Sequence, residues 1–254
     1  MARKNRIRLY IDTALDNGFE IKLSDSQSHY LLHVMKLSAG DELLAFDNRS
    51  GEYLCFVKEA AKKSVTLNIL DKTRGFFRPP DVWMLFAPVK KDQTDYIIQK
   101  ATELGATALV PIITSRTIAD KVRTDRFRAQ AIEAAEQSRR IDIPEIFEAV
   151  SFDKLLSDWD GERKLFYMDE TGAGDTIFKA FSEAARQNSG KTALLTGPEG
   201  GFSAKPLSAA AFLWEREYSE RKQPLPPLWR VGRLLPEIGT RSGKNYENSD
   251  CGRS

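Results

Sequence analysis

The stretch Ala193-Leu194-Leu195-Thr196-Gly197-Pro198-Glu199-Gly200-Gly201-Phe202-Ser203 joins an apolar run to a glycine-dense turn. Its glycines and its proline let the backbone bend sharply and approach a ligand closely. A buried strand that ends in such a turn is typical of a ligand site, but the same residues also form plain turns. The rest of the chain has to distinguish a binding loop from an ordinary turn.

Strands alternate with helices on the N-terminal side of this turn. Residues 82–89 and 108–113 are continuous apolar runs of the kind that is buried on both faces of a parallel sheet, and residues 164–168 form a further strand-like run. This alternation predicts an α/β layer architecture with a parallel sheet. Ligands of such sheets bind at the carboxyl ends of the strands, where Met168 and residues 196–201 would lie.

Helical periodicity fills the intervals between these strands. Asp92 is a candidate N-cap with Asp95 at the third helical position, and Gly105 would end that helix. Thr124 and Asp175 would open two further helices. The side chains expected to face the core are Ile97, Ile98, Ala101 and Leu104 in the first helix, Phe127, Ala131, Ile132 and Ala135 in the second, and Phe178, Phe181, Ala184 and Ala185 in the third.

The first 75 residues have a different pattern. Short strand-like runs at 8–11, 42–46, 53–57 and 64–70 are separated by turn signals, which predicts a small β-barrel, and residues 76–80 form a linker. The one helical stretch, residues 26–36, contains His29 and His33 four positions apart. A metal pair needs further ligands, and no third ligand cluster accompanies these histidines, so we expect no metal site.

Charge and composition restrict the class of protein. The chain has 254 residues and a formal net charge of +2, so the overall charge does not by itself indicate a nucleic-acid binder. Basic residues gather at 3–8, 90–91 and 123–140; single charges usually solvate a surface, but their coincidence with site-like loops favours RNA binding. Two cysteines, and no apolar stretch suited to a signal or a membrane span, lead us to expect a cytoplasmic protein.

The glycine-dense turn does not have the sequence of a phosphate-binding loop. No Gly-Lys-Ser/Thr follows it, and the carboxylate of Glu199 would repel a phosphate. A neutral or cationic ligand is therefore favoured. S-adenosylmethionine has this chemistry, because its sulfonium is positive and its adenine can be bound by backbone groups that glycines expose.

Six segments, taken in order, resemble the RsmE family of SPOUT-class methyltransferases. The most specific are Lys-x-x-Glu-Leu-Gly at 100–105 and Gly-Pro-Glu-Gly-Gly at 197–201, and the others lie at 90–92, 111–116, 136–140 and 164–172. The resemblance implies a PUA-like RNA-binding β-barrel over residues 1–75 and a knotted SPOUT α/β domain over residues 76–254. Periodicity alone would instead give an ordinary doubly wound sheet.

The resemblance also implies an activity, which is methyl transfer from S-adenosylmethionine to N3 of a uridine in small-subunit (16S) ribosomal RNA or the 30S particle, by a homodimer. The cofactor-binding residues that it implies are Met168, Leu195, Thr196, Gly197, Glu199, Gly200 and Gly201. Met168 is equally typical of a strand core.

Candidate residues for catalysis and RNA binding are basic. Arg140 matches the arginine of the family's Gln-Ser-x-Arg segment and would favour the uracil N3 anion, although an arginine near a helix end also interacts with the helix dipole. The candidate RNA contacts are Arg6, Arg8, Lys91 and Arg116. The sequence indicates no general base.

The resemblance ends after Ser203. Family members continue with a Leu-Gly-x-Arg-Ile-Leu-Arg-x-Glu-Thr-Ala segment, whereas the tail here has no regular period. The codons for residues 214–227 can be read one base earlier, so that each new triplet starts at the last base of the preceding codon. The amino acids that these shifted triplets permit include the missing motif, residue for residue. We therefore hypothesise a frameshift between about residues 203 and 211. If the tail is genuine, the alternatives are a catalytically impaired RNA-binding protein and a non-enzymatic ribosome-associated protein.

Overall fold

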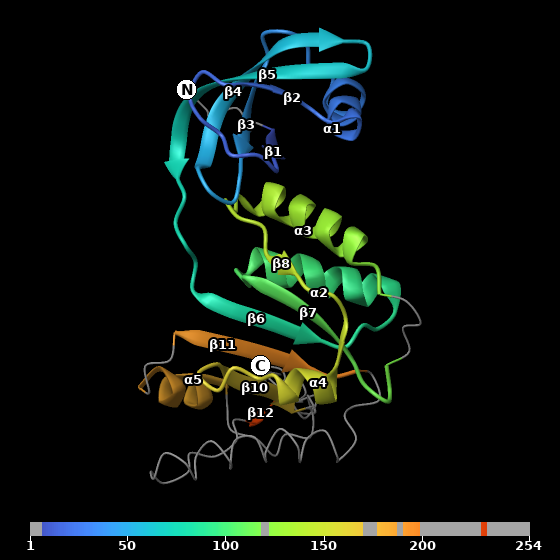
Figure 1. Cartoon of the computed structure of the whole chain (residues 1–254), viewed down its shortest axis with the longest axis vertical. Helices are drawn as coiled ribbons and strands as arrows, with labels where there is room; N and C mark the ends of the chain where they lie inside the picture. Colours follow the sequence, from blue (N-terminus) through green and yellow to red (C-terminus); the bar gives the residue numbers. More distant parts are fainter. Residues whose placement is uncertain (1–6, 118–121, 170–176, 187–189, 199–229, 233–254) are drawn as a thin grey trace, which may run out of the picture.

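The structure is a computed structural model that describes residues 7–117, 122–169, 177–186, 190–198 and 230–232. It has two sheets at opposite ends of an elongated molecule, with the helices α2 (Lys91–Glu103) and α3 (Thr124–Ser138) between them (Figure 1). The chain passes from the N-terminal sheet to the second sheet through the linker at residues 76–80.

The N-terminal domain is a five-stranded sheet with the order β1-β3-β4-β5-β2. Its strands are β1 (Arg8–Tyr10), β2 (Glu20–Lys22), β3 (Glu42–Phe46), β4 (Gly51–Ala61) and β5 (Ser64–Gly75). Neighbours pair antiparallel except for β1, which is parallel to β3. Alternate residues such as Cys55, Val57, Leu67 and Ile69 share one apolar cluster, so the period-two pattern that predicted these strands also builds the core.

Two elements of this domain differ from the prediction. β2 was not expected, because two of its three residues are exposed and so short a segment has no readable pattern. The single helix expected at 26–36 consists of α1 (Asp25–His29) followed by a π-helical segment, Tyr30–Val34. Ser24 and Gln27 cap α1 reciprocally, which explains its start.

The C-terminal domain has a parallel sheet with the order β12-β10-β11-β6-β7-β8. Its strands are β6 (Asp81–Phe86), β7 (Ala108–Ile113), β8 (Glu145–Ile146), β10 (Lys164–Asp169), β11 (Lys191–Thr196) and β12 (Arg230–Gly232), and β9 (Val150–Ser151) pairs with β7. The predicted parallel α/β sheet is confirmed. The expected knot lies outside the described residues, which stop at Pro198 and resume at Arg230.

The two ends of this sheet are called here the amino edge, where its strands begin, and the carboxyl edge, where they end. β11 lies between β6 and β10, so the turn after Thr196 leaves from the middle of the carboxyl edge. This is the position at which parallel sheets bind their ligands. The amino edge lies nearer to the linker, because the linker leads directly into β6.

Helices cover both faces of the parallel sheet. α2 and α3 pack on one face, where Ile98 and Phe127 belong to the same apolar cluster as Phe86. α4 (Phe152–Ser157) packs on the other, where Phe152 shares a cluster with Leu85. Adjacent residues of β6 are therefore buried on opposite faces, which explains the continuous apolar run.

The predicted helices need small corrections. α2 begins at Lys91, two residues before the start that an Asp92 N-cap would give, because the Thr94 hydroxyl bonds both backbone groups of Val89 just ahead of the helix. Leu104 was predicted to face the core but is 86% exposed at the end of this helix. α3 begins at Thr124 as predicted.

The third predicted helix is α5 (Ile177–Arg186). Its inward residues include Ala180, which is fully buried, and Phe181, whose ring stacks against Phe166 with centroids 4.6 Å apart. Phe178, predicted to face inward, is 80% exposed. Asp175 lies outside the described residues. No helix in the described part of the chain has the length and apolar character that a membrane span requires.

Candidate functional site

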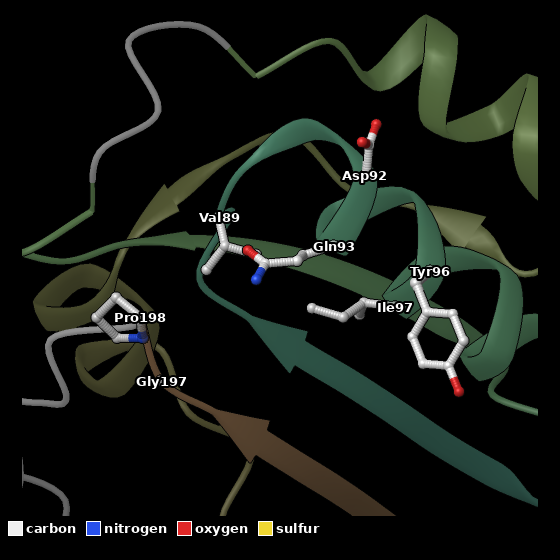
Figure 2. A pocket seen from close by; sticks show the side chains of 7 residues that line it. All are labelled: Val89, Asp92, Gln93, Tyr96, Ile97, Gly197 and Pro198. Carbon is white, nitrogen blue, oxygen red and sulfur yellow. The ribbon is translucent and has the colours of Figure 1, made fainter.

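A cavity of about 550 Å³ lies at the carboxyl edge of the parallel sheet. It is formed by the loop after β6, the first two turns of α2 and the end of β11 (Figure 2). Its lining residues are Val89, Asp92, Gln93, Tyr96, Ile97, Gly197 and Pro198. A cavity of this size, with apolar walls and a few polar groups, is typical of a small-molecule site.

The register of β6 and β11 explains why the cavity opens here. The two strands pair as far as Phe86 and Thr196, and the Ala87 N–H donates a last hydrogen bond to the Thr196 carbonyl at 3.2 Å. Beyond this bond the segment after β6 leads into α2, and the segment after β11 continues into Gly197. Because Gly197 has no side chain, its backbone is accessible to a ligand in the space between the two.

The rim of the cavity is charged. The Asp92 side chain is 97% exposed, and the Lys91 ammonium lies 3.9 Å from its carboxylate but 3.3 Å from that of Asp95. Asp95 also forms an ion pair with Arg126. Lys91 and Arg126 therefore share Asp95, and Asp92, which is more weakly paired, presents a solvent-exposed carboxylate at the rim.

Thr196 contributes a buried polar atom beside the cavity. Among the described residues its Oγ1 has no hydrogen-bond partner, although buried side-chain polar atoms are paired in the large majority of cases. Thr196 immediately precedes the cavity-lining Gly197. A ligand bound at this end of β11 would satisfy the hydroxyl.

The structure separates the predicted cofactor residues into three groups. Gly197 lines the cavity and Thr196 adjoins it. Leu195 is 1% exposed within the core cluster of Leu85, which places it in the core, whereas Met168 is partly buried beside Phe166 and Leu194. The predicted residues Glu199, Gly200 and Gly201 lie outside the described residues.

Arg8, a predicted RNA contact, is 7% exposed between the two domains. Its Nε donates to Glu52 Oε2 at 2.8 Å, its Nη1 to the carbonyls of Ala135 and Glu136 at 2.8 and 3.1 Å, and its Nη2 to the carbonyl of Arg140 at 2.7 Å. The last carbonyls of a helix have no partner within that helix, so Arg8 caps α3 from the other domain. These contacts assign Arg8 to joining the domains and not to binding RNA.

Arg140, the predicted catalytic residue, lies at the amino edge. Its Nε and Nη2 donate to the two carboxylate oxygens of Asp142 at 2.7 and 2.6 Å, and its Nη1 donates to the Thr102 carbonyl at 2.7 Å. Thr102 is near the end of α2, whereas the cavity is lined by the start of that helix. Within one chain the structure does not bring Arg140 to the cavity. Its hydrogen bond to the end of α2 instead matches the other interpretation of this residue, an arginine that interacts with a helix end.

Two further predicted RNA contacts, Lys91 and Arg116, are at the carboxyl edge. Lys91 begins α2 next to the cavity-lining Asp92, and its side chain is 69% exposed. Arg116 is exposed in the turn that follows β7. Both lie on the same edge as Gly197, so they stay candidates for RNA contact, while Arg6 lies outside the described residues.

Sequence reasoning missed the wall of the cavity that α2 supplies. Gln93 and Tyr96 were not considered, Val89 was assigned to a buried strand, and Ile97 was assigned to the core. A signal was available, because the helix that follows a parallel strand begins at the carboxyl edge, where ligands bind. In the described residues no group of three His, Cys, Asp or Glu side chains is arranged to hold a metal.

Comparison with known proteins agrees with this architecture. The RNA methyltransferase domain family matches residues 78–211, and the RNA methyltransferase PUA domain family matches residues 23–70. The curated ribosomal RNA small subunit methyltransferase E of Rickettsia conorii is 28% identical over 205 residues, which cover 80% of this chain and 82% of that protein. The protein of the same name from Bacillus subtilis is 28% identical over 190 residues, which cover 71% and 74%.

A solved structure shows the same fold. The crystal structure of a ribosomal RNA small subunit methyltransferase E from Neisseria gonorrhoeae bound to S-adenosyl methionine has a TM-score of 0.73 at 23% identity, covering 82% of this chain and 86% of that one. The predicted resemblance to the RsmE family is thus confirmed. Since the match to the RNA methyltransferase domain spans more than half of its length, the chain belongs to the RNA methyltransferase family.

Proposed function

We propose that this protein transfers a methyl group from S-adenosylmethionine to N3 of a uridine in small-subunit ribosomal RNA. The observation that supports the proposal most directly is the cavity at the carboxyl edge, with Gly197 in its wall and beside it the Thr196 hydroxyl, which has no partner in the part of the chain that the structure describes. The names of the relatives in Rickettsia conorii and Bacillus subtilis support the choice of RNA. The ligand named for the Neisseria gonorrhoeae structure supports the choice of donor.

The residues present fit such a donor. The apolar side chains of Val89 and Ile97 can cover an adenine ring, the backbone at Gly197 can approach its edge, and the Asp92 carboxylate favours a positive ligand. When bound, S-adenosylmethionine supplies a methyl group activated by the positive charge on its sulfur. The protein's own contribution is to exclude water with these walls and to fix the acceptor base in line with the methyl group, which can be worth roughly 7–11 kcal/mol.

Lys91 and Arg116 are the RNA contacts that we propose beside the cavity. Their positions on the carboxyl edge would let them hold phosphates on either side of the target nucleotide. A role for Arg140 at the uracil N3 anion would require the cavity of a second chain, because its own chain places it on the opposite edge. We therefore propose a homodimer that acts on RNA or on the 30S particle in the cytoplasm.

We also propose that the tail after about residue 203 results from a frameshift. The match to the RNA methyltransferase domain ends at residue 211, at the end of the interval in which the codon argument places the slip. Resequencing this interval and measuring the intact mass of the natively expressed protein would test the hypothesis. A gene without a slipped base and a mass equal to that of the printed chain would eliminate it.

Two measurements test the proposed activity. S-adenosylmethionine should be titrated calorimetrically into the chain as given and into a frame-restored chain, in which the reading frame after about residue 203 is corrected. The frame-restored chain should give saturable heat. Because a methyl group at N3 blocks Watson–Crick pairing, reverse transcription of the treated ribosomal RNA should stop at one uridine. Absence of donor binding in both chains, or methylation that causes no stop, would contradict the proposal.

A further inference from the structure

The linker segment, defined as Arg74-Gly75-Phe76-Phe77-Arg78, places two exposed phenylalanines between two arginines. Phe76 is 36% exposed and Phe77 is 60% exposed. Single exposed apolar residues are common on proteins, but two adjacent aromatic rings flanked by guanidinium groups are the combination that binds single-stranded nucleic acid.

The backbone holds the linker segment at both ends. β5 pairs Gly75 with Gly51, whose φ is +113° and where a Cβ would lie 2.2 Å from the Arg74 carbonyl oxygen and 2.8 Å from the Phe76 nitrogen. Only glycine therefore lets the segment leave the sheet at this point. Beyond Arg78, Pro79 and Pro80 restrict the chain to extended conformations.

The linker runs along one side of the molecule from β5 to β6 (Figure 1). An extended segment fixed at both ends loses less conformational entropy on binding than a free loop would. The two rings are consequently presented in a restricted geometry.

The surroundings of the linker segment are basic. Residues 72–80 include three Lys or Arg and no Asp or Glu. The Arg74 side chain is 41% exposed, and its Nη1 donates to the Arg139 carbonyl at 2.8 Å, which brings the exposed residue Arg139 beside the segment. Glu52 lies 4.0 Å from Arg74, but its side chain is 5% exposed and bonded to Arg8. The accessible charge is therefore positive, as phosphate binding requires.

We propose that the linker segment is a second RNA-contact surface, on which Phe76 and Phe77 stack with unpaired bases while Arg74 and Arg78 contact phosphates. The inference rests on the proposed function in that it takes RNA as the substrate. The segment lies at the amino edge, whereas the cavity lies at the carboxyl edge. It thus binds RNA away from the methylated nucleotide and contributes to affinity, not to the methyl-transfer step.

The test measures fluorescence anisotropy of a labelled, short oligouridylate with the full chain. Because stacking is worth about 1–3 kcal/mol per base, Phe77→Ala should weaken binding about 5- to 150-fold, whereas Phe77→Trp should retain it. Phe178→Ala is the matched control, since Phe178 is 80% exposed on α5, which belongs to neither the linker segment nor the cavity, and its loss should have no effect. Arg78→Gln removes one phosphate contact, so it should reduce the magnitude of the slope of log K against log salt by about one.

Two results would overturn this inference. One is Phe77→Ala binding oligouridylate like the unchanged protein, and the other is a shift of Phe77→Ala from dimer to monomer in sedimentation, which would show that a second copy of the chain covers the rings. Failure of the proposed function would be recognised separately. In that case S-adenosylmethionine would not bind, yet the difference between Phe77→Ala and Phe77→Trp in RNA affinity would persist.

Discussion

The polar groups at the two edges of the parallel sheet lie in different surroundings. At the amino edge, Arg140 bonds both oxygens of Asp142, and Arg163 bonds both oxygens of Asp81 while its Cζ lies 3.9 Å from the centroid of the Trp83 ring. Two buried atoms at this edge, Arg163 Nε and Thr102 Oγ1, have no hydrogen-bond partner among the described residues, but neither residue lines the cavity. At the carboxyl edge, the cavity adjoins a buried hydroxyl of Thr196 that has no partner among the described residues. Saturated polar groups stabilise a fold, whereas unsatisfied ones beside a cavity indicate where a ligand binds.

This difference separates arginines that the sequence presents as equivalent. Arg8 and Arg140 both occur in basic clusters and were predicted to act on RNA, but each is nearly buried and has acceptors for its guanidinium within the protein. Lys91 and Arg116 lie at the other edge, where charge remains exposed beside the cavity. The edge on which a basic residue lies therefore predicts whether its loss affects folding or binding.

The largest effect is expected for Arg8→Ala. It leaves Glu52 buried without its partner and uncaps α3, and breaking a buried ion pair in this way costs about 3–5 kcal/mol. Denaturant unfolding measures the loss. The matched control is Arg128→Ala, whose 3.0 Å pair with Asp12 is largely exposed and should cost less than about 1 kcal/mol. Equal losses in the two variants would show that burial of the ion pair does not decide its contribution to stability.

A smaller loss of stability is expected for Arg140→Ala. Removing hydrogen bonds to a charged group costs about 1.5–3 kcal/mol, and the binding of S-adenosylmethionine should remain unchanged because the cavity is at the other edge. Arg139→Ala, an exposed neighbour, is the control for general effects of charge. A variant that unfolds like the unchanged protein but no longer turns over would contradict the stabilising role and leave only the proposed role of Arg140 in the cavity of a second chain.

Gly197→Val should affect binding and leave the fold intact. Overfilling a packed site costs about 1–3 kcal/mol, so the affinity for S-adenosylmethionine should fall roughly 5- to 150-fold in calorimetric titration. Gly190→Val is the matched control, because a Cβ at this exposed glycine before β11 meets nothing within 4 Å. If both variants bind the donor equally well, the cavity is not the cofactor site.

The smallest effect concerns pH. The Arg163 guanidinium lowers the pKa of Asp81, so the folded pKa lies below the unfolded one and the pair contributes stability above about pH 4 that is lost as the pH falls further. Since the Asp81 side chain is 40% exposed, Asp81→Asn should cost less than about 1 kcal/mol at neutral pH, and this cost should shrink as the pH falls below about 4. A difference in unfolding free energy that grew on acidification would reverse this assignment.

The sequence predicted the sheet better than the site, for physical reasons. Burial on both faces of β7 and on one face of β4 leaves a readable apolar pattern, so these strands were recognised. Gly197 was recognised because a glycine-dense turn directly after a buried strand is typical of a ligand site. The partners of a guanidinium leave no such pattern, since Arg8 finds its acceptors 44 to 132 residues away. The role of Arg8 therefore became visible only in three dimensions.

Hydrogen exchange of the frame-restored chain, measured with and without S-adenosylmethionine, tests the division between the two edges most directly. Donor binding should protect the backbone amides of residues 87–97 and 195–197, which surround the cavity, and leave residues 139–146 at the amino edge unchanged. Protection of residues 139–146 without protection of the cavity segments would contradict the account.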